Sequence, residues 1–126
     1  MSLTGTIDDV VPSLQKVDIL VSPLRMGAGT KLKVAEAMGC GLPVVGSPLA
    51  FAGIPGRSGE HYVCVERDVD FVHAVCRLAE HPAERAAMGR AARALTQCAL
   101  DWDIIGDRLA ADIRAALAER ASGRNA

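Results

Sequence analysis

The order of elements along the chain is decided by residues 19–46, which read ILVSPLRMGAGTKLKVAEAMGCGLPVVG. The apolar runs Ile19–Val21 and Pro43–Gly46 predict two short buried strands, each followed by a serine and a proline. Between them, residues 30–38 predict a helix that begins after a glycine-containing loop. A strand, a helix and a strand in this order predict two parallel strands joined by a right-handed crossover.

The remaining elements extend this unit on both sides. The sequence predicts the end of a strand at Thr4–Ile7, a helical turn from Asp8-Asp9, a loop over Phe51–Glu60, a third strand at Tyr62–Val65, and helices that Asp68 caps, Pro82 opens and Asp101 caps. Inward-facing positions are expected at Leu32, Ala35, Met38, Phe71, Val72, Val75, Leu78, Ala79, Met88, Ala92 and Leu95.

These patterns predict an α/β fold with a partial doubly wound parallel sheet of three to four strands, flanked by helices. Doubly wound sheets commonly have five or six strands, so we expect half of such a sheet. Residues 1–121 are expected to form this partial domain, and residues 122–126 a disordered tail.

Composition excludes several classes of function. The 126 residues carry a formal net charge of −1, which gives no global basic field for nucleic acid. No apolar run approaches the roughly 18 residues that a membrane span needs, and no signal peptide is visible. The four cysteines form no CxxC pair and are expected to be buried free thiols, which favours a reducing, cytoplasmic location. The acidic residues form no cluster typical of a metal site.

The loop before the predicted helix at residues 30–38 is the richest candidate site. Ligands of open α/β sheets bind beyond the carboxyl ends of the strands, where this loop lies. Gly27 and Gly29 let the backbone approach a ligand, and the helix start offers free N–H groups. Arg25 and Lys31 add positive charge, a combination that suits a diphosphate. The alternative is that both glycines only permit a tight turn, since neither GxxxxGK[ST] nor GxGxxG is present.

Glu36 follows Gly29 by seven residues, about two helical turns or roughly 10 Å. It therefore falls on the helix face of Gly29 and Lys33. A carboxylate there can accept two hydrogen bonds from a ribose diol while the phosphates lie at the helix start. Alternatively, Glu36 pairs only with Lys33 or with solvent. Trp102 is interpreted as a packing anchor, with a sugar-stacking platform as the alternative. His61 is interpreted as a surface or edge residue, with a position that reaches the cleft as the alternative.

Residues 23–45 resemble the donor-site signature of the group 1 glycosyltransferases, a large retaining family of two-lobed GT-B enzymes. The segments Thr4–Asp9, Val17–Val21, Gly59-Glu60-His61 and Asp101-Trp102 also fit. The resemblance implies that Glu36 is the second glutamate of the family's paired motif and holds the donor ribose. It implies that Gly29, Thr30 and Lys31 meet the donor phosphates. The first glutamate of the pair would fall at Ala28 and is missing, which leaves sugar recognition open.

The implied function is donor binding in a retaining glycosyltransferase, within the C-terminal Rossmann-like domain of a GT-B enzyme. The donor would be a UDP-, GDP- or ADP-sugar, with no further cofactor and no metal. Gly27, Gly29, Thr30, Arg25, Lys33 and Glu36 are the candidate substrate-binding residues, and Lys31 is the candidate catalytic residue that stabilises the leaving diphosphate.

The acceptor would bind largely on an upstream lobe, so the chain alone is expected to be inactive and to self-associate as a homo-oligomer. Two other readings stay open. One is a GT-B sugar-nucleotide 2-epimerase, and the other is a non-catalytic α/β binding module such as a receiver domain.

Overall fold

The structure is a computed structural model that describes residues 5–123, with side chains through residue 120. Its elements are α1 (Val11–Leu14), β1 (Leu20–Ser22), α2 (Leu32–Gly39), β2 (Val44–Gly46), the 3₁₀ helix η1 (Pro48–Phe51), β3 (Val63–Cys64), α3 (Asp68–Glu80), α4 (Pro82–Ala99) and α5 (Trp102–Gly123). The order confirms the predicted strand, helix, strand sequence.

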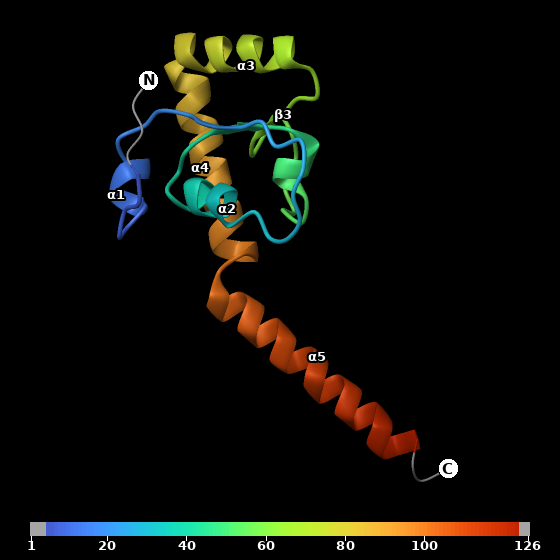
Figure 1. Ribbon diagram of the computed structural model, residues 1–126. Coiled ribbons are helices and arrows are strands. Elements are labelled where there is room, and N and C mark those ends of the chain that lie inside the picture. Colours follow the sequence, from blue (N-terminus) through green and yellow to red (C-terminus); the bar gives the residue numbers. More distant parts are fainter. Residues whose placement is uncertain (1–4, 124–126) are drawn as a thin grey trace.

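The three strands form one parallel sheet in the order β1-β2-β3 (Figure 1). Leu20 pairs with Val44, and Val45 pairs with Val63. The predicted α/β class and parallel sheet are therefore confirmed. A fourth strand is not formed by the described part of Thr4–Ile7, because residues 5–7 have no regular structure and Thr4 lies outside the described residues.

The core lies on both faces of this sheet. Adjacent residues of β2 point to opposite faces, so Val44 joins one apolar cluster and Val45 joins the other. The first cluster contains Val34, Ala37 and Met38 of α2 together with Ala92 of α4. The second contains Ala74 and Leu78 of α3 together with Met88 of α4. Helices thus cover both faces of the sheet, which gives the three layers of an α/β domain.

Several local predictions were wrong in detail. The helix α2 begins at Leu32 rather than Thr30, and the Leu32 side chain is exposed instead of facing inward. Val72 and Ala79 of α3 are also exposed. Arg67 rather than Asp68 occupies the N-cap of α3, with no side-chain capping bond.

Asp101 does cap α5 as predicted, because its Oδ1 accepts a hydrogen bond from the Asp103 N–H at 2.9 Å.

The last helix, α5, extends away from the sheet and the other helices (Figure 1). Its row of Ile105, Leu109, Ile113 and Leu117 is exposed along the helix. The helix includes Ser122 and Gly123, so the tail predicted from residue 122 was placed too early, and residues 124–126 lie outside the described part. None of the described helices combines the length and apolar character that crossing a bilayer requires.

All four cysteines are free thiols in the structure. Cys40 and Cys64 are partly buried, as expected for small apolar residues. Cys76 and Cys98 are exposed, which corrects the expectation that all four are buried.

Candidate functional site

The loop between β1 and α2 is held open by two glycines with positive φ angles, Gly27 at 134° and Gly29 at 80°. Both values lie in a region that other residues rarely adopt, so the loop conformation requires glycine there. The residue that follows β2 also fixes this loop, because the Ser47 hydroxyl donates a hydrogen bond to the Leu24 carbonyl at 2.6 Å. The loop therefore has a defined shape at the carboxyl edge of the sheet, where the sequence predicted a ligand.

The first turn of α2 faces this loop without a side-chain cap. The first bond within the helix is donated by the Val34 N–H to the Lys31 carbonyl at 2.9 Å. The N–H groups of Leu32 and Lys33 precede that bond, and a helix start of this kind carries partial positive charge. This end of α2 is therefore suited to an anion.

Lys31 is a buried cation at the same place. The residue is only 8% exposed, and its Nζ donates one long hydrogen bond, 3.4 Å, to the Gly27 carbonyl. Lys31 forms no ion pair with any carboxylate of the described residues. The ammonium thus has a single long bond to the protein and lies at an open pocket, where it is available to pair with an anion.

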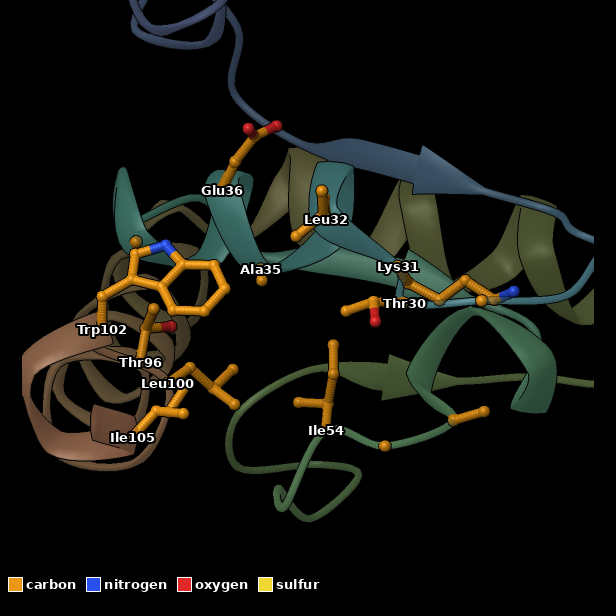
Figure 2. A pocket seen from close by; sticks show the side chains of 14 residues that line it. Thr30, Lys31, Leu32, Ala35, Glu36, Ile54, Thr96, Leu100, Trp102 and Ile105 are labelled. Carbon is orange, nitrogen blue, oxygen red and sulfur yellow. The ribbon is translucent and has the colours of Figure 1, made fainter. Parts of the chain in front are cut away.

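A pocket of about 600 Å³ runs along α2 from this point. Residues of the loop, α2, the segment 52–54, the end of α4 and the start of α5 line it (Figure 2). Four of the predicted site residues take part: Gly29, Thr30, Lys31 and Glu36. The structure therefore places Glu36 and the predicted phosphate-binding residues in the lining of one pocket.

Glu36 lies on α2, seven residues after Gly29, and lines the same pocket as Lys31. Its side chain is exposed, and its carboxylate points away from Ile54 and Ile105 on the other side of the pocket (Figure 2). Glu36 forms no ion pair with Lys33 or with other described residues. The carboxylate thus remains open to an external donor, and the alternative of a Glu36–Lys33 pair is not realised.

Two predicted cations lie apart from the pocket. Arg25 forms an ion pair with Asp68 across the loop, and both side chains are exposed. Lys33 is exposed on α2 and does not line the pocket. The sequence pattern does not indicate that Asp68, which was expected to cap α3, forms an ion pair with the guanidinium of Arg25 instead. Gly27 also lies outside the lining, but its carbonyl holds the Lys31 ammonium.

Trp102 is the pocket residue that the sequence interpretation missed. It was expected to be a packing anchor, yet it is 78% exposed and its indole lies beside Ala35 of α2 (Figure 2). Its position depends on the corner between α4 and α5, where Thr96 and Leu100 also reach the pocket. The only signal in the sequence was a lone tryptophan just after a helix cap.

Ser22, at the end of β1, carries a second unexpected feature. Its residue is 2% exposed, and its hydroxyl finds no hydrogen-bond partner among the described residues. Most buried hydroxyls are paired, so Ser22 is an unpaired polar group at the carboxyl end of β1.

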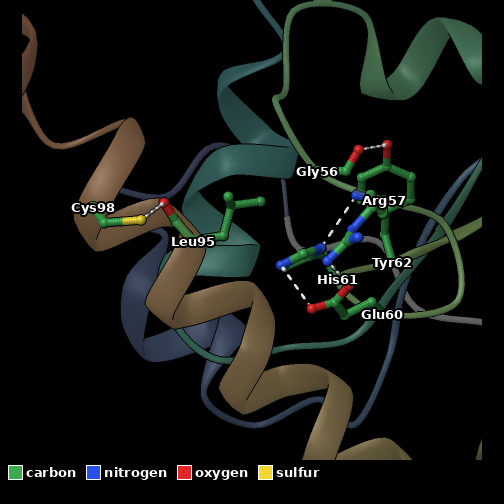
Figure 3. Close-up of polar contacts among 7 residues, drawn as sticks. All are labelled: Gly56, Arg57, Glu60, His61, Tyr62, Leu95 and Cys98. Carbon is green, nitrogen blue, oxygen red and sulfur yellow. Dashed lines mark hydrogen bonds and ion pairs between the residues drawn. The ribbon is translucent and has the colours of Figure 1, made fainter.

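The loop of residues 56–62 is held by its own polar contacts (Figure 3). The Nδ1 of His61 accepts from the Arg57 N–H at 3.1 Å, and its Nε2 lies 3.7 Å from a carboxylate oxygen of Glu60. The Tyr62 hydroxyl donates to the Gly56 carbonyl at 2.8 Å. The hydrogen bond from the Arg57 N–H to His61 therefore joins the two ends of this turn. In residues 5–123, no group of three or more His, Cys, Asp or Glu side chains is arranged to hold a metal ion.

Comparison with known proteins gives two matches. Residues 1–81 match a protein-family model described as glycosyl transferases, group 1. Over 108 residues, the chain is 32% identical to a GDP-mannose-dependent monoacylated alpha-(1-6)-phosphatidylinositol monomannoside mannosyltransferase of Corynebacterium glutamicum. That alignment covers 80% of this chain and 28% of the relative, so the chain spans just over a quarter of the relative's length.

Proposed function

Because the chain belongs to the group 1 glycosyltransferases, we propose that it binds the nucleoside diphosphate of a sugar donor in the pocket along α2. It is the donor-binding part of a retaining transferase that moves a sugar from this donor to an acceptor. The transferase activity is proposed for the whole protein in which these residues act, and the chain alone is inactive in this proposal.

The observation that carries the proposal is the buried residue Lys31, whose ammonium has no carboxylate partner among the described residues, beside the uncapped start of α2. Positive charge accumulates there from a full cation and from unpaired N–H groups. Gly27 and Gly29 carry no side chain, and their positive φ angles require glycine, so the backbone at these two positions is open to a ligand. A diphosphate is the part of a sugar donor that such a site recognises.

The spacing from Gly29 to Glu36 supports a contact between Glu36 and the ribose of the nucleotide. Glu36 follows Gly29 by seven residues, and the last part of this separation, from Leu32 to Glu36, is one turn of α2, about 6 Å along the helix. A ribose attached to a diphosphate at the helix start would therefore reach the open carboxylate. Glu36 would accept hydrogen bonds from the two ribose hydroxyls, which are charge-assisted.

The same groups can assist the reaction. Negative charge develops on the nucleoside diphosphate as the bond to the sugar breaks. Fixed N–H dipoles and a preplaced cation stabilise that charge without reorganising at the moment of reaction. Lys31 is the side chain proposed for this role, since it is held at the helix start by the Gly27 carbonyl.

Experiment must determine which base and which sugar the donor carries. The name of the Corynebacterium glutamicum relative specifies GDP-mannose, so guanosine diphosphate belongs in the first panel of ligands. Free thiols at all four cysteines support a reducing, cytoplasmic setting for the protein.

Titration with nucleoside diphosphates is the direct test. Amide chemical shifts of the 126-residue chain are expected to move with UDP, GDP or ADP, with the largest changes at Gly29, Thr30 and Leu32. Inorganic phosphate should move the same amides at higher concentration, because it offers the charge without the ribose and base. Shifts confined to residues outside the α2 pocket would refute the proposal.

Glu36→Gln is expected to weaken nucleoside diphosphate binding by about tenfold to a hundredfold. The amide still accepts a hydrogen bond but loses a charged acceptor, worth roughly 1.5–3 kcal/mol. Calorimetric titration against GDP and UDP measures the effect, and Glu80→Gln on α3 serves as the control with the same change of charge. Equal affinities for the Glu36→Gln variant and the unmodified chain would show that Glu36 does not hold the ribose.

A further inference from the structure

Trp102 differs from the other residues that line the pocket along α2. Tryptophan side chains are large and are mostly buried on average, yet Trp102 is 78% exposed. Its indole lies beside Ala35, and Gly39, about one turn further along α2, also lines the pocket (Figure 2). Because Ala35 and Gly39 are small, they leave most of the indole surface open to a ligand.

The position of Trp102 along the pocket matches the order of the groups in a nucleotide sugar. In such a molecule the diphosphate joins the sugar on one side to the ribose on the other, and the base is attached to the ribose. Lys31 lies at one end of the pocket, whereas Glu36 and Trp102 lie at the other end (Figure 2). With the diphosphate at Lys31 and the ribose at Glu36, the base extends toward Trp102, and the transferred sugar lies on the far side of the diphosphate.

The side chains around Trp102 are poorly suited to hydrogen-bond the edges of a base. Thr96 lies near the indole, but its hydroxyl already donates its proton to the Ala92 carbonyl at 2.9 Å. Leu100 and Ile105 also line this end of the pocket, and their side chains have no polar atoms. Among the described residues that line this end, the indole N–H is therefore the one side-chain donor left free. A base bound here keeps its edges in water and gains mainly by stacking.

We infer that Trp102 stacks on the base of the nucleoside diphosphate and thereby sets the preference of this chain among bases. This contact rests on the proposed function, because the diphosphate and ribose contacts place the base. Every base has a π-face, so stacking selects by the size of the ring system and not by the groups at its edges. The chain therefore prefers purine over pyrimidine diphosphates and does not distinguish guanine from adenine.

The fluorescence of Trp102 reports this contact directly, because it is the single tryptophan of the chain. GDP and ADP are both expected to quench it with a saturable dependence on concentration, and their affinities should agree within about twofold. UDP, whose base has the smaller ring system, should bind about threefold more weakly or worse. Inorganic pyrophosphate should bind at the start of α2 without quenching, because it carries no base.

Substitutions at Trp102 separate stacking from a structural role of the side chain. Trp102→Leu is expected to weaken GDP binding about tenfold in calorimetric titration and to leave pyrophosphate binding unchanged. Trp102→Phe should recover most of the GDP affinity, because it restores an aromatic face. Leu109→Ala, at an exposed residue of α5 outside the pocket, is the control and should change neither affinity. Circular dichroism checks that all three variants keep the fold.

The base contact and the donor site fail in different ways. If Trp102→Leu bound GDP as tightly as the unmodified chain while Lys31→Met and Glu36→Gln weakened binding, the donor site would stand and stacking by Trp102 would be refuted. Equal losses of GDP and pyrophosphate affinity in Trp102→Leu would reveal a structural role and refute stacking as well. Quenching by GDP-mannose and not by GDP would place the sugar, instead of the base, on Trp102. If the chain bound neither GDP nor pyrophosphate, the donor proposal would fall and the base contact with it.

Discussion

Replacing Gly89 by alanine is expected to remove about 3 kcal/mol or more of the free energy of unfolding. A Cβ at this position of α4 would lie 2.1 Å from the Gly41 carbonyl oxygen and 3.1 Å from its carbon. Both are backbone atoms, so no side chain can turn away, and α4 must move off α2 instead. That movement opens the packing of Met88 and Ala92, which serve the two core clusters.

Gly106→Ala is the control for helix propensity. Gly106 also lies in a helix, α5, and a Cβ there would meet no atom within 4 Å. Alanine at that position should leave stability unchanged or raise it by up to about 1 kcal/mol. Urea denaturation followed by circular dichroism compares the two variants with the unmodified chain. Equal midpoints for Gly89→Ala and Gly106→Ala would mean that α2 and α4 are not in the close contact described above.

The second large effect is expected at Lys31, where methionine should weaken nucleoside diphosphate binding by at least a hundredfold. The ammonium supplies charge-assisted hydrogen bonds to phosphate oxygens, and each contributes roughly 1.5–3 kcal/mol. Methionine is unbranched like lysine and one atom shorter, so it fills the space up to Cε without the charge. Without ligand, the variant should be more stable by about 1 kcal/mol, because the substitution removes a buried cation that has only one long hydrogen bond.

Lys33→Met provides the comparison for charge alone. Lys33 is two residues away on α2 but exposed and outside the pocket. Its replacement should reduce the affinity for the nucleoside diphosphate only severalfold, because it removes only a long-range attraction, which salt screens. Calorimetric titration with GDP and thermal melting together test the opposite signs predicted for Lys31. If Lys31→Met bound nucleotide normally, or if both lysine variants lost binding equally, Lys31 would not be the phosphate residue.

The local units of the fold were predictable because their signals are local. Apolar runs next to serine and proline predicted β1 and β2, and the glycines after residue 38 predicted where α2 ends. Met88, Ala92 and Leu95 of α4 face inward as their spacing indicated. The ends of helices were less predictable. The start of α2 was predicted at Thr30, but Thr30 and Lys31 belong to the loop and the helix begins at Leu32.

The candidate site was predictable only in part. The loop glycines, Lys31 and Glu36 lie on one continuous segment, so their order along the site follows from the sequence. The pairing of Arg25 with Asp68 joins the β1–α2 loop to the start of α3, and no periodicity relates those residues. The exposure of Trp102 depends on where α4 ends and α5 turns away, which is a property of helix packing.

The sequence alone therefore determined the strand, helix, strand unit and the seven-residue spacing between Gly29 and Glu36, because bonded geometry and nearest neighbours set them. The tertiary structure decided which lysine is buried, which cation is already paired, and that α2, α4 and α5 enclose one pocket. Burial and enclosure arise from contacts between segments far apart in the chain. Their free energies depend on how whole helices pack, and a pattern read along one segment carries no information about that packing.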